Sequence, residues 1–244
     1  MQTNSALKLF FRSIFLLTLV VSCSFQSFAQ ETKKGTFTLD IVQRKTYGYA
    51  IHIPKNTREK KPLLVFLHGD GEKGTDIEKV KIHGPFQYLL THELDAFVLA
   101  PQCPENETWD TEVLYNLILR IQKEYNVDPN RIYVTGLSSG GWATFNLALS
   151  HPDFLAAIVP ISSFVDLLPL EFICKIKAVP IHMFHGLLDD VVPIEYPTAV
   201  YKELKKCDAN IHFTIFDDAN HNSWTRVYDN ATIYEWMFQQ IKKS

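Results

Sequence analysis

Short apolar runs alternate with segments of helical periodicity along most of this chain, and no other feature restricts its fold as strongly. Residues 63–67 are apolar throughout, which is typical of a strand buried on both faces of a sheet. Residues 112–125 place apolar side chains at a helical spacing. The alternation predicts the α/β class, with a doubly wound and mostly parallel sheet. Further strands are expected at 97–100, 132–135, 157–161, 181–185 and 211–216, and further helices at 139–149, 197–206 and 232–241.

Two extended runs precede this alternation, at residues 36–42 and 46–53. They are separated only by Gln43, Arg44 and Lys45, so they predict an antiparallel hairpin at one edge of the sheet. Residues 128–130, Asp-Pro-Asn, are expected to form a turn. Beside these elements we expect no large lid domain, because no remaining stretch is long enough to form one.

The first thirty residues carry the pattern of a secretory signal. Lys8 and Arg12 place positive charge ahead of an apolar run at 13–21, which is too short to span a bilayer. The run has no amphipathic period, which disfavours the alternative of a buried N-terminal helix. We therefore expect a secreted or periplasmic protein, or one that is lipid-anchored in the cell envelope.

Two positions for the end of this leader are open. The small residues around 27–29 favour a signal peptide of residues 1–29 and a mature start at Gln30. Residues 20–23 resemble a bacterial lipobox, which would give a leader of residues 1–22 and a lipid on Cys23. In both cases residues 30–244 are expected to form a single domain without a membrane span.

Charge and cysteine content exclude several classes of protein. The chain has 24 Lys and Arg against 27 Asp and Glu and no basic stripe, so nucleic acid is not an expected partner. Four cysteines are too few for a disulfide scaffold. With Cys23 in the leader, at most one bridge is expected among Cys103, Cys174 and Cys207, and the sequence leaves the pair open.

The most specific motif is Gly-Leu-Ser-Ser-Gly at residues 136–140, between a predicted strand and a predicted helix. This is the G-x-S-x-G pattern in the context that a nucleophile elbow needs. The elbow projects the hydroxyl of Ser138 above the sheet, and side chains two residues to either side would collide there. Ser139 is the rival nucleophile, but the bulky Leu137 would then occupy a position that needs a small residue.

An acid and a histidine follow two later strands. Asp189 lies in the loop after 181–185, and His221 lies in a polar loop after 211–216. Active sites of open α/β sheets lie at the carboxyl ends of the strands, so we expect these side chains to meet Ser138. The order Ser, Asp, His is that of one serine-hydrolase triad arrangement. Asp217 and Asp218 are the next candidates for the acid.

The loop at residues 67–71, Leu-His-Gly-Asp-Gly, follows the first buried strand. Acyl transfer develops an oxyanion, which backbone N–H groups stabilise. We expect the donors to be the N–H groups of Asp70 and Ser139. The carboxylate of Asp70 must then face away from the oxyanion, toward Lys73.

These segments resemble the dienelactone-hydrolase and phospholipase/carboxylesterase-like esterases of the α/β-hydrolase superfamily. The resemblance is greatest to a branch of secreted bacterial "predicted peptidases" and polyhydroxybutyrate depolymerases, and extends to feruloyl and acetylxylan esterases. It implies an α/β-hydrolase fold, Asp189 as the triad acid in the H-G-x-x-D-x-x-V-P pattern, and His221 as the triad base. Asn220 stands where the family often has glycine. The segments are 63–74, 131–162, 185–193 and 219–224, and the resemblance begins near Thr36.

The expected activity is hydrolysis of carboxylic esters, on carbohydrate-linked or other small-acyl or aromatic substrates. Trp109, Trp142 and Trp224 are candidate substrate contacts, with packing as the alternative role. His182, His185 and His212 do not form a metal constellation, and His182 and His185 point to opposite faces of one strand, so we expect no metal. We expect no cofactor either. Three alternatives remain: a serine peptidase of the prolyl-oligopeptidase type, an acyltransferase, and a non-catalytic carbohydrate-binding protein.

Overall fold

The computed structural model describes residues 44–242, and the structural statements below concern this part of the chain. It contains a seven-stranded sheet with the order β1-β3-β2-β4-β5-β6-β7. β1 runs antiparallel to β3, and all other neighbouring strands are parallel. The prediction of an α/β fold with a mostly parallel sheet is confirmed. The strands are β1 Gly48–His52, β2 Lys61–Leu67, β3 Phe97–Gln102, β4 Val127–Leu137, β5 Ala157–Ile161, β6 Ile181–Gly186 and β7 Ile211–Phe216.

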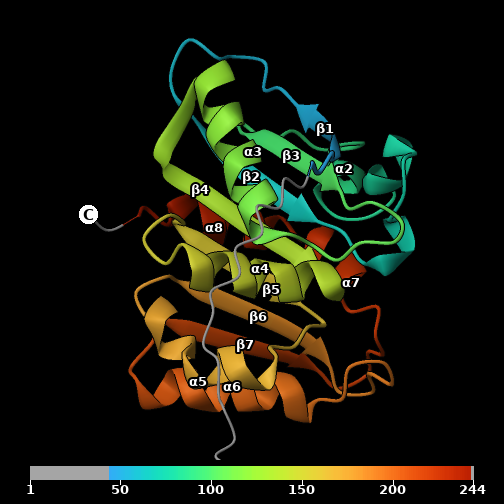
Figure 1. Cartoon of the computed structure of the whole chain (residues 1–244), viewed down its shortest axis with the longest axis vertical. Helices are drawn as coiled ribbons and strands as arrows, with labels where there is room; N and C mark the ends of the chain where they lie inside the picture. Colours follow the sequence, from blue (N-terminus) through green and yellow to red (C-terminus); the bar gives the residue numbers. More distant parts are fainter. Residues whose placement is uncertain (1–43, 243–244) are drawn as a thin grey trace, which may run out of the picture. The chain divides into compact units, whose positions relative to one another are not determined.

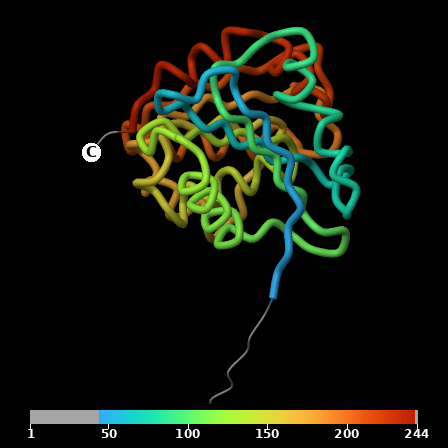
Figure 2. Tube along the Cα trace, turned by 90° about the horizontal axis from the view of Figure 1, so that it is seen from above, coloured from blue at the N-terminus to red at the C-terminus, as the bar shows by residue number. Residues whose placement is uncertain are grey.

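Helices cover both faces of this sheet. Figure 1 shows α3, α4 and α6 in front of the strands and α8 behind them. Figure 2 shows the same layering from above, with the green α3 and the red C-terminal segment on opposite sides. The longer helices are α3 Thr111–Glu124, α4 Ser139–Ser150, α6 Glu195–Lys206 and α8 Ala231–Gln239. The short ones are α2 Pro85–Tyr88, α5 Leu167–Glu171 and α7 Trp224–Tyr228, with 3-10 turns η1 Asp70–Glu72, η2 Ile77–Lys81 and η3 Ile173–Ile176.

β2 shows how the sequence builds the two cores. The strand is buried along its whole length. Because successive side chains point to opposite faces, Leu63 and Val65 enter the core that contains residues of α3 and α4. Leu64 and Phe66 enter the second core, which contains residues of α7 and α8. The unbroken apolar run is therefore explained by helices on both sides of the strand.

Two local features differ from the expectations. The predicted turn at 128–130 lies within the bounds of β4, where pairing with β2 is irregular: Lys61 pairs with Val127, and Leu63 with Ile132. The side-chain hydrogen bond typical of such a turn is still present, since the side chain of Asp128 accepts a hydrogen bond from the N–H of Asn130 at 3.0 Å.

The first arm of the predicted hairpin, 36–42, lies outside the described residues. Its second arm contains β1, whose described partner is β3.

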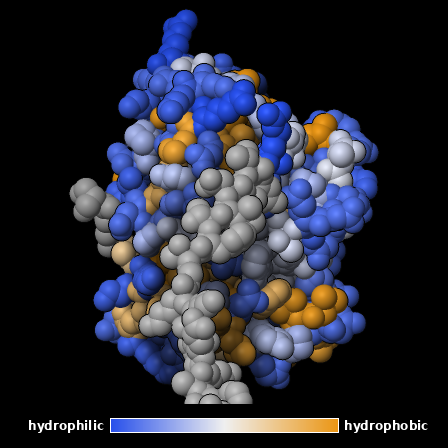
Figure 3. All heavy atoms as spheres, viewed as in Figure 1, coloured by the Kyte–Doolittle hydropathy of each residue, from blue (hydrophilic) through white to orange (hydrophobic). Residues whose placement is uncertain are grey.

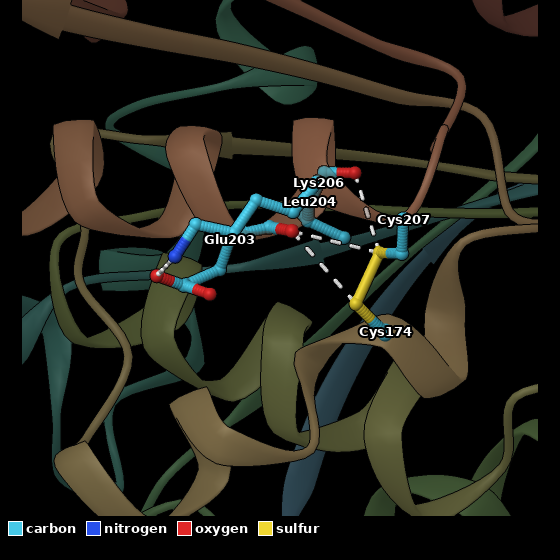
Figure 4. The surroundings of a disulfide bond; sticks show 5 residues. All are labelled: Cys174, Glu203, Leu204, Lys206 and Cys207. Atoms are coloured by element: carbon cyan, nitrogen blue, oxygen red, sulfur yellow. Dashed lines mark hydrogen bonds and ion pairs between the residues drawn. A yellow bond between two sulfur atoms is a disulfide. The ribbon is translucent and has the colours of Figure 1, made fainter.

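One disulfide joins Cys174 in η3 to Cys207 at the end of α6, with 6.0 Å between their Cα atoms (Figure 4). This pair was left open by the sequence. Cys103 is a free and buried thiol. Between residues 44 and 242, no helix is long and apolar enough to cross a bilayer.

Candidate active site

Ser138 lies at the sharp turn between β4 and α4. Its φ of 53° is in the left-handed region, which is strained for a residue with a side chain. A Cβ atom on Gly136 would lie 2.4 Å from the carbonyl carbon of Gly140, and one on Gly140 would lie 2.0 Å from the carbonyl oxygen of Leu67. Neither position has room for a side chain, which is the physical reason for the glycines of the motif.

The structure brings the three predicted side chains together. The Nε2 atom of His221 lies 3.1 Å from the Oγ atom of Ser138. The Nδ1 atom of His221 lies 2.9 Å from Oδ2 and 3.0 Å from Oδ1 of Asp189. A carboxylate can only accept, so Nδ1 carries the hydrogen and Nε2 presents its lone pair to the hydroxyl. This arrangement can remove the hydroxyl proton and stabilise the imidazolium that results.

The carboxylate of Asp189 is fully enclosed, with 0 % of its side chain exposed. Its Oδ1 accepts hydrogen bonds from the N–H groups of Val191 at 3.0 Å and Val192 at 2.8 Å. The Nε2 atom of His185 lies 3.2 Å from Oδ2. By contrast, the neighbouring Asp190 is exposed. Of the two adjacent aspartates, Asp189 is therefore the one that reaches His221.

Two serines hold the loop that carries His221, and sequence reasoning missed both. The hydroxyl of Ser162 donates to the carbonyl oxygen of His221 at 2.8 Å and lies 2.8 Å from the hydroxyl of Ser223. Ser162 adopts a φ of 47° directly after β5. A buried serine in this strained conformation at a strand end could not be recognised from its residue type alone.

The loop after β2 is anchored by a neutral histidine. The Nδ1 atom of His68 lies 2.6 Å from the carbonyl oxygen of Gly69, and its Nε2 accepts the N–H of Cys103 at 3.1 Å. Nδ1 therefore carries the single hydrogen. Burial lowers the pKa of His68 to about 4, so the ring is neutral near pH 7. His68 thus ties this loop to the end of β3.

The two residues predicted to donate N–H groups to the oxyanion are Asp70, two residues after His68, and Ser139, directly after Ser138. Ser139 is the first residue of α4, where an N–H group has no partner within the helix. The Asp70 carboxylate is mostly exposed and forms an ion pair with Lys73 at 2.7 Å. That it faces away from the oxyanion stays a prediction. Partial burial acts to raise the pKa of Asp70, but the Lys73 partner holds it below its usual value.

Glu72 was not singled out from the sequence as a site residue, although it belongs to the same segment after β2, in η1. Only 6 % of Glu72 is exposed, and burial raises its pKa. One carboxylate oxygen lies 3.7 Å from Nε2 of His83, and the other is buried without a hydrogen-bond partner among the described residues. A Cβ atom at Gly69 would lie 3.5 Å from that oxygen and 3.6 Å from Cβ of Ser138. The buried carboxylate of Glu72 and the nucleophile elbow therefore both border Gly69.

The three tryptophans occupy different surroundings. The indole of Trp224 packs edge to face against His221, with centroids 5.2 Å apart. The indole N–H of Trp142 donates to the carboxylate of Asp166 at 2.7 Å. Trp109 is only 4 % exposed and packs against His68 at 4.7 Å. Trp109 thus presents little surface to a ligand, and a substrate contact for any of the three stays a prediction.

The histidines of β6 and β7 do not form a metal centre. Nε2 of His182 lies 3.1 Å from the hydroxyl of Thr214, and the ring centroids of His182 and His212 are 5.5 Å apart. Within residues 44–242, no three His, Cys, Asp or Glu side chains are grouped as metal ligands would be.

Comparison with known proteins places this chain among esterases. The family described as phospholipase/carboxylesterase matches residues 97–234. A bifunctional acetylxylan esterase/xylanase of Neocallimastix patriciarum is 28% identical over 81% of this chain and 29% of its own length. Feruloyl esterase B of Talaromyces stipitatus is 29% identical over 44% of this chain and 33% of its own length. The chain thus spans about a third or less of these two curated relatives.

Solved structures agree with this placement. A thermostable esterase superposes with a TM-score of 0.69 and 33% identity, over 80% of this chain and 59% of the other. The acetyl xylan esterase of Aspergillus awamori superposes with a TM-score of 0.61 at 14% identity, over 78% of this chain and 93% of the other. The second likeness concerns the fold alone.

Proposed function

Because the chain belongs to the phospholipase/carboxylesterase family of α/β-hydrolases, we propose that it hydrolyses carboxylic esters with Ser138 as the nucleophile. The observation that carries the proposal is the hydrogen-bonded series Ser138, His221 and Asp189, at distances of 3.1 and 2.9 Å. Each member follows a different strand, and the three strands β4, β6 and β7 run in the same direction in one sheet.

The proposed reaction has two steps. His221 accepts the proton of Ser138 as the hydroxyl attacks the ester carbonyl, and Asp189 stabilises the imidazolium. The N–H groups of Ser139 and Asp70 hold the oxyanion of the tetrahedral intermediate. His221 then donates its proton to the leaving alcohol, and water repeats the sequence on the acyl-enzyme.

A groove beside the Asp189 loop supports a substrate with an apolar or aromatic group. Its volume is about 550 Å³. Val191 and Val192, whose N–H groups donate to Asp189, lie on its wall, so the groove lies beside the loop that holds the proposed triad acid. Figure 3 shows apolar surface near the carboxyl ends of β6 and β7. Val191, on the wall of the groove, is 62% exposed. The other lining residues are Phe164, Val165, Asp166, Leu167, Pro193 and Tyr196.

The relatives support carbohydrate-linked and aromatic esters as the substrate class, because they include acetylxylan and feruloyl esterases. An activity panel tests this. It compares p-nitrophenyl acetate, methyl ferulate, acetylated xylan and a peptide anilide. Turnover of the esters without cleavage of the anilide supports the proposed class, whereas preferential cleavage of the anilide would support a peptidase.

Export from the cytoplasm is part of the proposal. The Cys174–Cys207 disulfide supports it, because structural disulfides form mainly in oxidising compartments. The leader pattern supports it from the sequence. Mass spectrometry of the mature N-terminus decides between Gln30 and a lipidated Cys23, and an intact Met1 on a cytosolic protein would contradict both.

The nucleophile is tested with two neighbouring serines. Ser138→Ala should lose hydrolysis and fluorophosphonate labelling, whereas Ser139→Ala keeps the backbone N–H and should retain both. Loss of a triad serine lowers kcat by about a millionfold in subtilisin. Activity that survives in Ser138→Ala and disappears in Ser139→Ala would reverse the assignment.

A further inference from the structure

A second imidazole, that of His185, contacts the same carboxylate as His221. The Nε2 atom of His185 lies 3.2 Å from Oδ2 of Asp189 and 2.8 Å from the carbonyl oxygen of Val192. The side chains of His185 and Asp189 are both 0 % exposed. Water therefore does not compete for these contacts, and their geometry is fixed by the protein interior.

The partners of His185 define its hydrogen. A carbonyl oxygen can only accept, so Nε2 of His185 carries the hydrogen and donates it to Val192, while the same nitrogen lies 3.2 Å from Oδ2 of Asp189. Nδ1 of His185 has no hydrogen-bond partner among the described residues, as suits the bare nitrogen of a neutral ring. Burial is the main cause that lowers the pKa of His185, and the nearby His221 lowers it further. The Val192 carbonyl and Asp189 act to raise this pKa, but it stays below its usual value. His185 is thus a neutral donor.

The two oxygens of Asp189 are held differently. Oδ1 accepts the N–H groups of Val191 and Val192, whereas Oδ2 faces only the two histidines among its described polar contacts. Rotation about the Cβ–Cγ bond of Asp189 would carry Oδ2 away from His221. The contact with His185 opposes that rotation. Val192 closes the arrangement, because its N–H donates to Asp189 and its carbonyl accepts from His185.

The end of β6 also fixes the loop that carries His221. A Cβ atom on Gly186 would lie 2.3 Å from the carbonyl oxygens of both Ala219 and Asn220. The N–H of Leu188 donates to Ala219 at 2.9 Å. His185 thus lies where the strand meets the segments of both the acid and the base.

We propose that His185 is a positioning residue, which orients the Asp189 carboxylate so that Oδ2 faces Nδ1 of His221. The inference rests on the proposed function, in which His221 is the base. It assigns His185 no contact with substrate. Without the Nε2 donor, Asp189 would stabilise the imidazolium of His221 less well, so the rate should fall and the pH at which the base becomes protonated should move down.

The test compares His185→Leu with His185→Gln and a matched control. Leu removes the donor, whereas the amide of Gln can reach the position of Nε2. The control is His182→Leu on the same strand, because the described hydrogen bond of the His182 ring is with Thr214 and not with a triad side chain. Fluorophosphonate titration counts active sites, and p-nitrophenyl acetate gives kcat, KM and the pH profile per site.

The expected result for His185→Leu is a loss in kcat of about tenfold, with little change in KM and a kinetic pKa shifted downward. His185→Gln should recover most of the rate and the wild-type pH profile. His182→Leu should keep both. If His185→Leu retains the wild-type kcat per site and pH profile, or if His182→Leu shows the same changes, the positioning role is wrong.

A substrate-free measurement separates this inference from the proposed function. NMR titration of the imidazole resonances in the resting protein should show His185 protonated at Nε2 and should show the titration of His221 shifted downward in His185→Leu. If that variant does not fold, His185→Asn takes its place, since its shorter amide cannot reach Oδ2. A wild-type protein without esterase activity would contradict the proposed function, while an unshifted His221 titration would contradict the role of His185.

Discussion

The Nε2 atom of His221 lies 3.1 Å from the Oγ atom of Ser138, although 83 residues separate the two in the chain. The distance follows from the topology, because β4 and β7 are parallel members of one sheet and both residues follow the carboxyl ends of these strands. Parallel strands thus bring distant loops to one edge, where a hydroxyl and an imidazole can react together.

Replacement of the two adjacent aspartates should have very different effects. Asp189→Asn should lower kcat by about ten-thousandfold, as the same change does in a serine protease, because the amide favours the wrong tautomer of His221. Asp190→Asn should lower it by less than about tenfold, since the exposed charge of Asp190 is screened by solvent. One activated ester at neutral pH suffices for the comparison. A large loss of kcat in Asp190→Asn, together with a nearly normal kcat in Asp189→Asn, would show that Asp190 and not Asp189 is the triad acid.

Glycine at position 140 should be irreplaceable. A Cβ atom there would lie 2.0 Å from the carbonyl oxygen of Leu67, so Gly140→Ala should destabilise the fold by more than about 3 kcal/mol or prevent it. Gly71 is the matched control, because nothing lies within 4 Å of a Cβ atom at that position. Urea unfolding of Gly140→Ala and Gly71→Ala checks this. Equal free energies of unfolding for the two variants would contradict the close approach of Gly140 to Leu67 at the elbow.

Loss of the disulfide should lower stability without changing the chemistry. The bridge between Cys174 and Cys207 closes a loop with a sequence separation of 33 residues, for which chain entropy predicts about 4 kcal/mol. The double variant Cys174→Ser/Cys207→Ser should therefore unfold at lower urea concentration but retain kcat below its unfolding transition. Cys103→Ser, at the free buried thiol, serves as the comparison. An unchanged urea midpoint in the double variant would exclude a stabilising role for the bridge.

Stability should fall as the pH drops from about 6.5 to about 4. Burial lowers the pKa of His68 and of His182 from the ordinary value of 6.5 to about 4. The neighbouring His212 adds to the lowering at His182. Below pH 6.5 the unfolded chain binds protons at these rings that the folded protein does not bind. The loss is up to about 1.4 kcal/mol per pH unit for the fully buried His68, and smaller for the partly exposed His182.

Urea midpoints at pH 7, 6 and 5 measure this dependence. His182→Leu should reduce the slope, whereas replacement of the exposed His92 by Leu should leave it unchanged. A slope that stays the same in His182→Leu would show that its ring is not the source of the effect.

The fold was predictable because its signals are local. The apolar run inside β2 and the helical spacing of α3 specify buried strands and an amphipathic helix without knowledge of the rest of the chain. Short elements such as α5 and α7, with five residues each, were missed because a single helical turn gives no period to recognise. The interruption of pairing near Asp128 was missed because it depends on how β4 meets β2.

The candidate site was predictable where a motif fixes geometry. Ser138 could be chosen over Ser139 because only one of them has glycines two residues away on both sides. The contact of Ser162 with the His221 loop and that of His185 with Asp189 could not be predicted. Ser162 and His221 follow different strands, and no spacing in the sequence joins them. His185 and Asp189 are only four residues apart, but the H-G-x-x-D spacing identifies the acid and does not report the contact between the two side chains.

The measurement that tests the central proposal most directly is capture of the acyl-enzyme. The protein is mixed with p-nitrophenyl acetate, quenched in acid within the first turnovers and digested for mass spectrometry. We predict an acetyl group on Ser138 in the wild-type protein, and a greatly reduced rate of its accumulation in His221→Ala. An acetyl group on Ser139 or on another residue, with Ser138 unmodified during active turnover, would contradict it.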